Sequence, residues 1–191
     1  MPRADLTNDL VHWIKGDSDE EAFDVLKQIV QERCLCGGTG HIRGGYQCVC
    51  FTEAPQNTFH NVIGRYRPFG IRVSKKWLYQ EGGRPVIYQS DQEYDALPES
   101  HRWRHVRYEP DADPSIDFTW EREWRIQTGE LHLPPGEARL VLPHEAWSDR
   151  LAAEHLEHED YRIHLAAVAY GDEWLMQQPE PFRYAYSIIK V

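Results

Sequence analysis

The sequence has no run of about eighteen apolar residues, and it therefore predicts no membrane-spanning helix. Residues 1–5 hold no apolar segment of the kind found in secretory signals, so we expect a cytoplasmic protein with no membrane partner. The glycine-rich loops of dinucleotide-binding and P-loop proteins are missing, as is the Gly-x-Ser-x-Gly elbow of hydrolases. Positive charge is also scarce. The 21 Lys and Arg face 31 Asp and Glu, and the net charge of −10 argues against broad binding to nucleic-acid backbones.

Cysteine is rare, and all copies fall in one short segment. They are Cys34, Cys36, Cys48 and Cys50. Zinc sites usually have two to four residues between paired cysteines, whereas each pair here has one. The pairs either hold zinc or act as small buried residues on strands, and the spacing favours burial. A disulfide is not expected in a cytoplasmic protein. His155 and His158 suit either a metal or a solvated helix end. We favour the helix end, and predict no metal site.

Apolar residues are plentiful, and their pattern predicts the fold. They make up 41% of the 191 residues, with 7 Trp and 10 Tyr, which suffices for one well-packed domain over residues 1–191. Ser18 and Glu21 form a capping box that opens a helix to residue 30. Short helices are predicted for residues 59–67, 76–79, 91–97 and 144–156. Strands are predicted for residues 10–14, 46–51, 68–74, 85–88, 102–108, 117–126, 138–143, 163–170 and 184–191. We therefore expect an α+β fold with mixed, mainly antiparallel sheets and short helices.

A basic and aromatic run occupies residues 102–108. Its basic residues are Arg102, Arg104 and Arg107, and Trp103, His105 and Tyr108 are interleaved with them. This composition suits either a nucleic-acid surface or a sheet strand with one charged face. We favour the strand, because the net charge of the chain is strongly negative.

The segment 117–126 concentrates the charged and aromatic residues of the chain. On a strand, alternate side chains point to opposite faces. One face would then carry Trp120, Arg122, Trp124 and Ile126. The other would carry Glu121, Glu123 and Arg125, with the two carboxylates about 7 Å apart. Two interpretations stay open. The charged face either binds one ligand through both carboxylates, or it is solvated and holds one Glu–Arg pair.

Several motifs follow one another in a characteristic order. They are Leu10-Val11-His12-Trp13, Val49-Cys50-Phe51-Thr52-Glu53, Arg65-Tyr66-Arg67-Pro68-Phe69-Gly70-Ile71, Lys76-Trp77-Leu78, Pro85-Val86-Ile87-Tyr88 and Trp120-Glu121-Arg122-Glu123-Trp124-Arg125. Over residues 10–145 this order resembles the bacterial abortive-infection AbiGi proteins and related DUF2971-type proteins. More distantly, it is similar to the ADP-ribosyltransferase superfamily, including DarT-like toxins. The second resemblance implies an ADP-ribosyltransferase-like fold and the use of NAD as a substrate.

The transferase resemblance also implies roles for individual residues. Glu123 would stabilise the oxocarbenium-like ribose formed when the nicotinamide bond breaks, and Glu121 would orient or deprotonate the acceptor. His12 would bind the adenosine ribose, beside the same crevice as Glu123. The pyrophosphate would be held by Arg65 or Arg125, the middle-strand residue would be Thr52 or Tyr66, and Tyr66 or Tyr46 would stack on nicotinamide.

Two functions follow from these resemblances. The first is an NAD-dependent ADP-ribosyltransferase effector, a toxin or anti-phage protein that modifies a nucleic-acid base or a protein and is opposed by an antitoxin. The second is a non-catalytic binding module with a degenerate site, such as an antitoxin or a sensor of a phage component. The superfamily's Ser-Thr-Ser triplet is replaced here by Phe51-Thr52-Glu53, which favours the second function.

Overall fold

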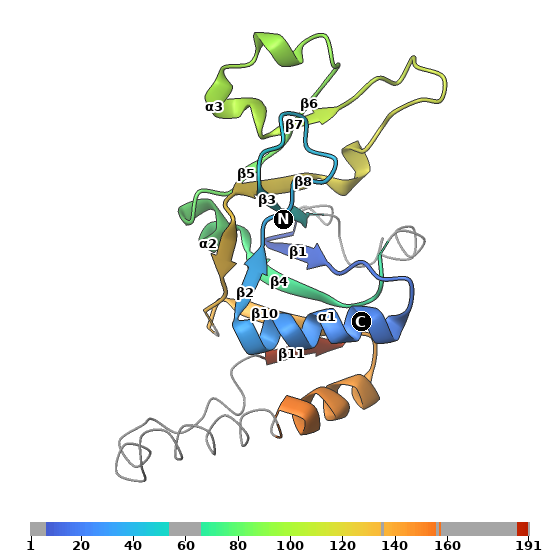
Figure 1. The fold of residues 1–191 in the computed structure, drawn as a ribbon, viewed down its shortest axis with the longest axis vertical. Helices are drawn as coiled ribbons and strands as arrows, with labels where there is room; N and C mark the ends of the chain where they lie inside the picture. Colours follow the sequence, from blue (N-terminus) through green and yellow to red (C-terminus); the bar gives the residue numbers. More distant parts are fainter. Residues whose placement is uncertain (1–6, 54–65, 135, 156, 158–186, 191) are drawn as a thin grey trace, which may run out of the picture.

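The chain folds around a seven-stranded sheet with the strand order β11-β10-β4-β1-β3-β8-β5 (Figure 1). The computed structural model describes residues 7–53, 66–134, 136–155, 157 and 187–190. The strands of this sheet are β1 (Asp9–Trp13), β3 (Cys48–Thr52), β4 (Gly70–Ser74), β5 (Arg84–Pro85), β8 (Glu123–Gln127), β10 (Ala138–Leu142) and β11 (Ser187–Lys190). All neighbours in this sheet are antiparallel except β10 and β11, which are parallel.

Two small sheets flank the large one. One pairs β2 (Cys34–Cys36) with β9 (Glu130–His132) in antiparallel register, and the other pairs β6 (Ile87–Gln89) with β7 (His105–Arg107) in parallel. The short helices are α2 (Lys75–Gln80), α3 (Glu99–Arg102), η2 (Tyr94–Ala96) and η3 (Thr119–Glu121). The predicted α+β domain with mainly antiparallel sheets and few helices is confirmed.

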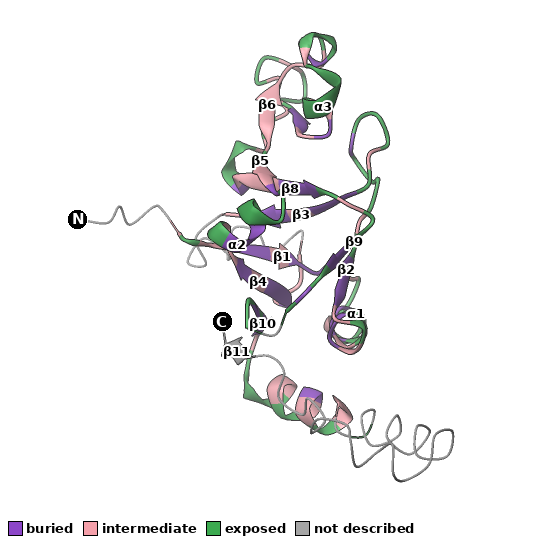
Figure 2. Cartoon of the chain, turned by 90° about the vertical axis from the view of Figure 1, so that its left-hand side faces the viewer, coloured by how far each residue is buried: buried purple, intermediate pink, exposed green. Residues whose placement is uncertain are grey.

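One face of the large sheet is covered by α1 (Asp19–Glu32), which lies beside β2 and β9 (Figure 2). The predicted start of this helix is confirmed, because the Ser18 side chain accepts a hydrogen bond from Glu21 N. Residues at helical spacing then bury one side of the helix against the sheet. They are Ala22, Phe23, Leu26, Ile29 and Val30. Residues 145–155 form a further helix, whose Trp147 ring lies 4.9 Å from that of Phe23.

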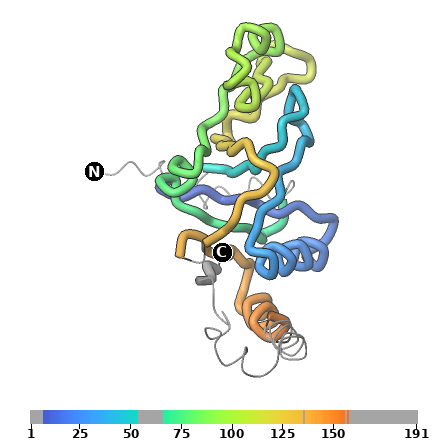
Figure 3. Tube along the Cα trace, turned by 60° about the vertical axis from the view of Figure 1, so that its left-hand side comes forward, coloured from blue at the N-terminus to red at the C-terminus, as the bar shows by residue number. Residues whose placement is uncertain are grey.

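A small lobe built from residues 86–118 projects from the β8 side of the sheet (Figure 3). It contains β6, β7, η2 and α3, and it packs against β3 through Trp103, which shares a buried cluster with Ile42 and Cys48. In the part of the chain that the structure describes, no helix is long and apolar enough to cross a membrane.

The predicted strand over residues 102–108 is only partly right, because residues 99–102 are helical and pairing begins at His105. The segment 163–170 lies outside the described residues. The predicted strand over 184–191 appears as β11 in its described part. The small sheet of β2 and β9 was not predicted, because three-residue strands carry too little alternation to be recognised.

Candidate functional site

The predicted strand over residues 117–126 is interrupted in its middle. Residues 119–121 form the 3₁₀ helix η3, and Arg122 adopts a left-handed conformation with φ 46°. Pairing with β3 begins only at Glu123, which lies opposite Thr52. The prediction that Glu121 and Glu123 share one face of one strand is therefore wrong. A positive φ at a non-glycine residue breaks the alternation on which that prediction depended.

The break nevertheless brings several predicted site residues to one place, where β3 ends and β8 begins. Thr52 pairs with Glu123, and the backbone N–H of Glu53 donates to the carbonyls of Glu121 and Arg122 at 3.2 and 3.3 Å. Glu121 is buried although it precedes the strand. The Tyr66 hydroxyl donates to a carboxylate oxygen of Glu121 at 3.5 Å.

The carboxylate of Glu123 is bound to the guanidinium of Arg125. Arg125 Nε donates to Glu123 Oε1 at 2.8 Å, and Nη2 donates to Oε2 at 3.3 Å. The two side chains are only 12% and 5% exposed, which makes this a buried, two-pronged ion pair. Burial alone lowers the pKa of Arg125, but the Glu123 charge and its hydrogen bonds outweigh burial and raise that pKa.

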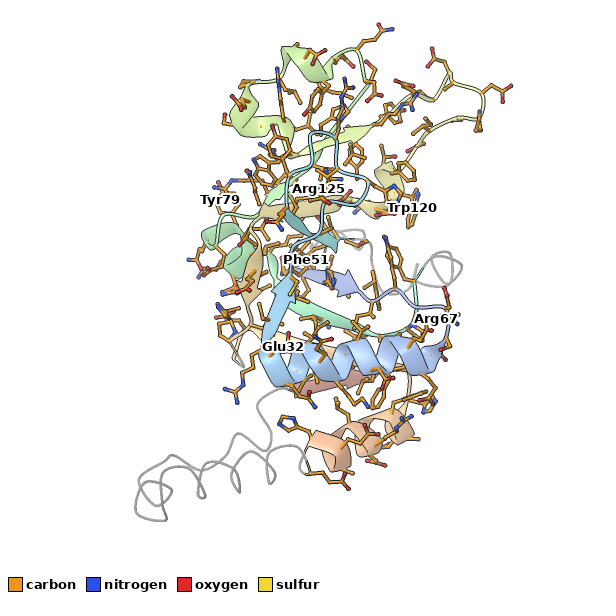
Figure 4. The ribbon with its side chains drawn as sticks, in the orientation of Figure 1. Glu32, Phe51, Arg67, Tyr79, Trp120 and Arg125 are labelled. Atoms are coloured by element: carbon orange, nitrogen blue, oxygen red, sulfur yellow. The ribbon has the colours of Figure 1, made fainter. Side chains whose placement is uncertain are left out.

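Arg125 also fastens the small lobe to the sheet. Its Nη1 donates to the carbonyl of Trp103 at 3.1 Å and to that of His105 at 2.9 Å. Both carbonyls belong to the lobe formed by residues 86–118. Each of the three guanidinium nitrogens of Arg125 therefore donates to a protein acceptor, and Figure 4 shows the side chain inside the molecule, at β8. The geometry gives Arg125 a structural role and leaves no nitrogen uncommitted for a pyrophosphate.

Tyr88 was not predicted as a member of this group. Its hydroxyl oxygen accepts a hydrogen bond from the backbone N–H of Glu123 at 2.9 Å, which supports the first residue of β8. Burial, together with the nearby charges of Glu123 and Glu121, raises the pKa of Tyr88 to about 12. No local sequence signal marks Tyr88, because it reaches β8 from a strand 35 residues earlier.

His12 lies on the opposite face of the sheet from Glu123. Residues paired across neighbouring strands point to the same face, so the pairs Val11–Thr52 and Thr52–Glu123 place Glu123 on the Val11 face. His12 follows Val11 and therefore points the other way, where its ring meets that of Phe51 at 5.8 Å between centroids. The prediction that His12 and Glu123 border one crevice is wrong.

His12 is instead part of the sheet's packing. Its Nδ1 lies 2.8 Å from the carbonyl oxygen of Cys50, as expected of an N–H donor. Burial lowers the pKa of His12, so the neutral imidazole is favoured. Both properties are those of a histidine satisfied within the fold, and neither requires a nucleotide.

The cysteines next to the site are protonated. Burial raises the pKa of Cys48 to about 11, and burial together with the Glu123 charge raises that of Cys50 further. Cys34 and Cys36 lie apart from them on β2. Among the residues that the structure describes, no group of three or more His, Cys, Asp or Glu side chains is arranged to hold a metal.

Two other predicted binding residues do not join the group. Tyr46 packs beside the cluster of Ile42, Cys48 and Trp103, away from the end of β3. Arg65 lies outside the described residues.

Comparison of the chain with protein-family models, curated proteins and solved structures finds no match. The site must therefore be interpreted from its own geometry. That geometry brings Thr52, Tyr66, Glu121 and Glu123 together, excludes His12 from the group and commits Arg125 to the fold.

Proposed function

We propose that the protein is a non-catalytic binding module, such as an antitoxin or a sensor of a phage component. The observation that carries the proposal is the buried ion pair between Glu123 and Arg125. A transferase would need the Glu123 carboxylate beside the ribose of NAD, where positive charge develops. Here both carboxylate oxygens accept hydrogen bonds from Arg125.

An exposed tryptophan supports a binding role. Trp120 is 40% exposed, and Figure 4 shows it at the edge of the molecule on η3. The turn that carries it is fixed, because Asp117 Oδ1 accepts hydrogen bonds from the Thr119 N–H at 2.8 Å and the Thr119 hydroxyl at 2.6 Å. Tryptophans that are held rigidly at a surface are frequent energetic centres of protein interfaces.

The charge around Trp120 indicates what kind of partner would fit. Asp111, Asp113 and Asp117 are exposed on the loop that leads into η3. The chain as a whole carries a net charge of −10. Complementary charge favours a basic protein surface as the partner, with Trp120 as the apolar contact at its centre.

Capture from a lysate of the source cells tests this proposal. We expect the immobilised protein to retain a partner that the Trp120→Ala variant binds at least about thirtyfold more weakly, the effect of losing a residue worth about 2 kcal/mol. Raised salt should release the partner, because the interface is charged. Val25→Ala is the control, since Val25 is 43% exposed and lies on α1. Equal retention by the Trp120→Ala variant and the original protein would rule out Trp120 as the contact.

ADP-ribosyl transfer is the second candidate function. The observation in its favour is that Thr52, Tyr66 and Glu121 lie close to Glu123, at the place where β3 ends and β8 begins. In this hypothesis Glu121 would have to act on the ribose, because Glu123 is engaged by Arg125.

An assay with NAD separates the two candidates. We expect the protein to release no nicotinamide and to transfer no label from NAD, whether nucleic acid or protein is offered as the acceptor. The physical reason is that the Glu123 carboxylate is neutralised by Arg125. Release of nicotinamide that Glu121→Gln abolishes, in a variant with unchanged thermal unfolding, would establish the transferase and overturn the binding module.

A further inference from the structure

Two arginines, Arg84 on β5 and Arg104 just before β7, lie near each other without a carboxylate partner among the described residues. Several described arginines form ion pairs with carboxylates, among them Arg43, Arg67, Arg72, Arg107, Arg125 and Arg150. Arg84 and Arg104 form no such pair with any described residue, although carboxylates outnumber basic residues in the sequence.

Both guanidinium groups are held in place by backbone carbonyls. Arg84 Nη1 donates to the carbonyls of Tyr79 at 2.9 Å and Gly83 at 2.7 Å. Arg104 Nε donates to the carbonyl of Pro85, the residue after Arg84, at 2.9 Å. Each group therefore keeps nitrogen atoms for a further acceptor, since a guanidinium has five N–H donors. The groups are oriented in advance, which lowers the entropy lost on binding.

The two positive charges lie near each other, because the Arg104 side chain reaches the carbonyl of Pro85, the residue that follows Arg84. Burial lowers the pKa of Arg104, and the charge of Arg84 lowers it further. An anion placed between the two groups would remove this repulsion, which no described carboxylate does. A pair of arginines is well suited to the oxygens of a phosphate, because guanidinium forks match their spacing.

An exposed aromatic ring lies directly beside the pair. The guanidinium carbon of Arg84 is 3.9 Å from the centre of the Tyr79 ring, which is a stacked cation–π contact. Tyr79 is 54% exposed, and Figure 4 shows it at the outer edge of the molecule. Rings that combine exposure with a neighbouring basic group are the stacking surfaces that nucleotide bases use.

We propose that Arg84 and Arg104 bind the phosphate of a nucleotide, whether free or at the end of a nucleic-acid strand, and that Tyr79 stacks on its base. This site lies beside the Glu123–Arg125 pair, since Arg84 is paired with Arg125 across β5 and β8, but it uses other side chains and does not rest on the proposed binding module. The net charge of −10 disfavours a long duplex, whose many phosphates would be repelled. A ligand that presents one or a few phosphates to the pair avoids that repulsion.

The other two arginines of the predicted basic and aromatic run take no part in this site. Arg102 donates to the carbonyls of Leu97 and Asp95, and Arg107 is paired with Glu109. Arg104 of that run instead reaches the carbonyl of Pro85, next to Arg84. The proposed site is therefore formed by Arg84 and Arg104, which come from two separate segments, and not by the continuous run of residues 102–108.

Calorimetric titration of the whole protein tests the proposal. The probes are adenosine 5′-monophosphate, adenosine, inorganic phosphate and a short single-stranded oligonucleotide. We expect the nucleotide to bind more tightly than inorganic phosphate, and adenosine not to bind. Arg104→Gln and Arg84→Gln should each weaken nucleotide binding by at least about tenfold, the effect of losing one charged hydrogen bond. Tyr79→Ala should weaken binding of the nucleotide and leave that of inorganic phosphate unchanged.

Arg139→Gln is the matched control. Arg139 is exposed on β10, so this substitution removes one positive charge at a different place on the surface. Thermal unfolding of each variant shows whether it is folded. Arg104→Gln is the decisive variant, since it gives up one hydrogen bond within the fold, whereas Arg84 also supports the end of α2. Tighter binding of the oligonucleotide, with steep salt dependence, would identify a strand as the source of the phosphate. Failure of the nucleotide to bind, or equal weakening by Arg139→Gln, would overturn the proposal.

Discussion

Replacement of Arg125 by methionine is expected to lower the free energy of unfolding by about 3–5 kcal/mol. The variant keeps most of the side-chain volume but leaves the Glu123 carboxylate buried without a counter-charge. It also leaves the carbonyls of Trp103 and His105 without their donor. An unpaired buried acceptor costs about 1–3 kcal/mol in its own right. Chemical denaturation monitored by tryptophan fluorescence measures the change.

Arg150→Met is the matched control for this prediction. Arg150 also forms ion pairs, with Glu20 and Glu154, but its side chain is 39% exposed. Exposed pairs contribute roughly 0–1 kcal/mol, so the same substitution should have a small effect there. If the two variants lose equal stability, Arg125 does not hold the lobe to the sheet in the way that its contacts indicate.

Phe51→Ala is the second substitution with a large expected effect. Phe51 is fully buried on β3, the strand between β1 and β8, where it pairs with Trp124 on β8 and meets the His12 ring. Truncation of a buried phenylalanine costs about 3–5 kcal/mol, because transfer energy is lost and a cavity remains. Denaturant titration should therefore show an earlier midpoint with an unchanged slope.

Val25→Ala provides the contrast for the core substitution. Val25 lies on α1 but is 43% exposed, so its truncation should change stability by less than about 0.5 kcal/mol. A small effect of Phe51→Ala would mean that Phe51 is not buried in the core. The register between β1 and β3, from which the position of His12 was derived, would then be wrong.

Much of the fold could be predicted from local pattern. Strands β1, β3, β4 and β10 each combine apolar content with nearby turn residues, and α1 has both a cap and a helical stripe. These signals act within a few residues of each other along the chain. They are therefore visible without knowledge of the tertiary structure.

The arrangement of the site could be predicted only in part. The spacing of Glu123 to Arg125 allowed one Glu–Arg pair, and the structure contains that pair. The left-handed turn at Arg122 leaves no trace in the alternation of residue types. The face of the sheet to which His12 points depends on the register between β1 and β3. The contacts of Arg125 depend on a lobe that is distant from it in the sequence. Both are tertiary properties.

A double-mutant cycle on Glu123 and Arg125 isolates the energy that the two side chains contribute together, and it therefore measures whether the Glu123 carboxylate depends on Arg125. The variants are Glu123→Gln, Arg125→Met and the combination, each measured by denaturant titration. We predict a coupling energy of at least about 1 kcal/mol, with the double variant less destabilised than the sum of the single ones. Additivity within about 0.5 kcal/mol would contradict the account, since it would show a Glu123 carboxylate that does not depend on Arg125 and is available for chemistry.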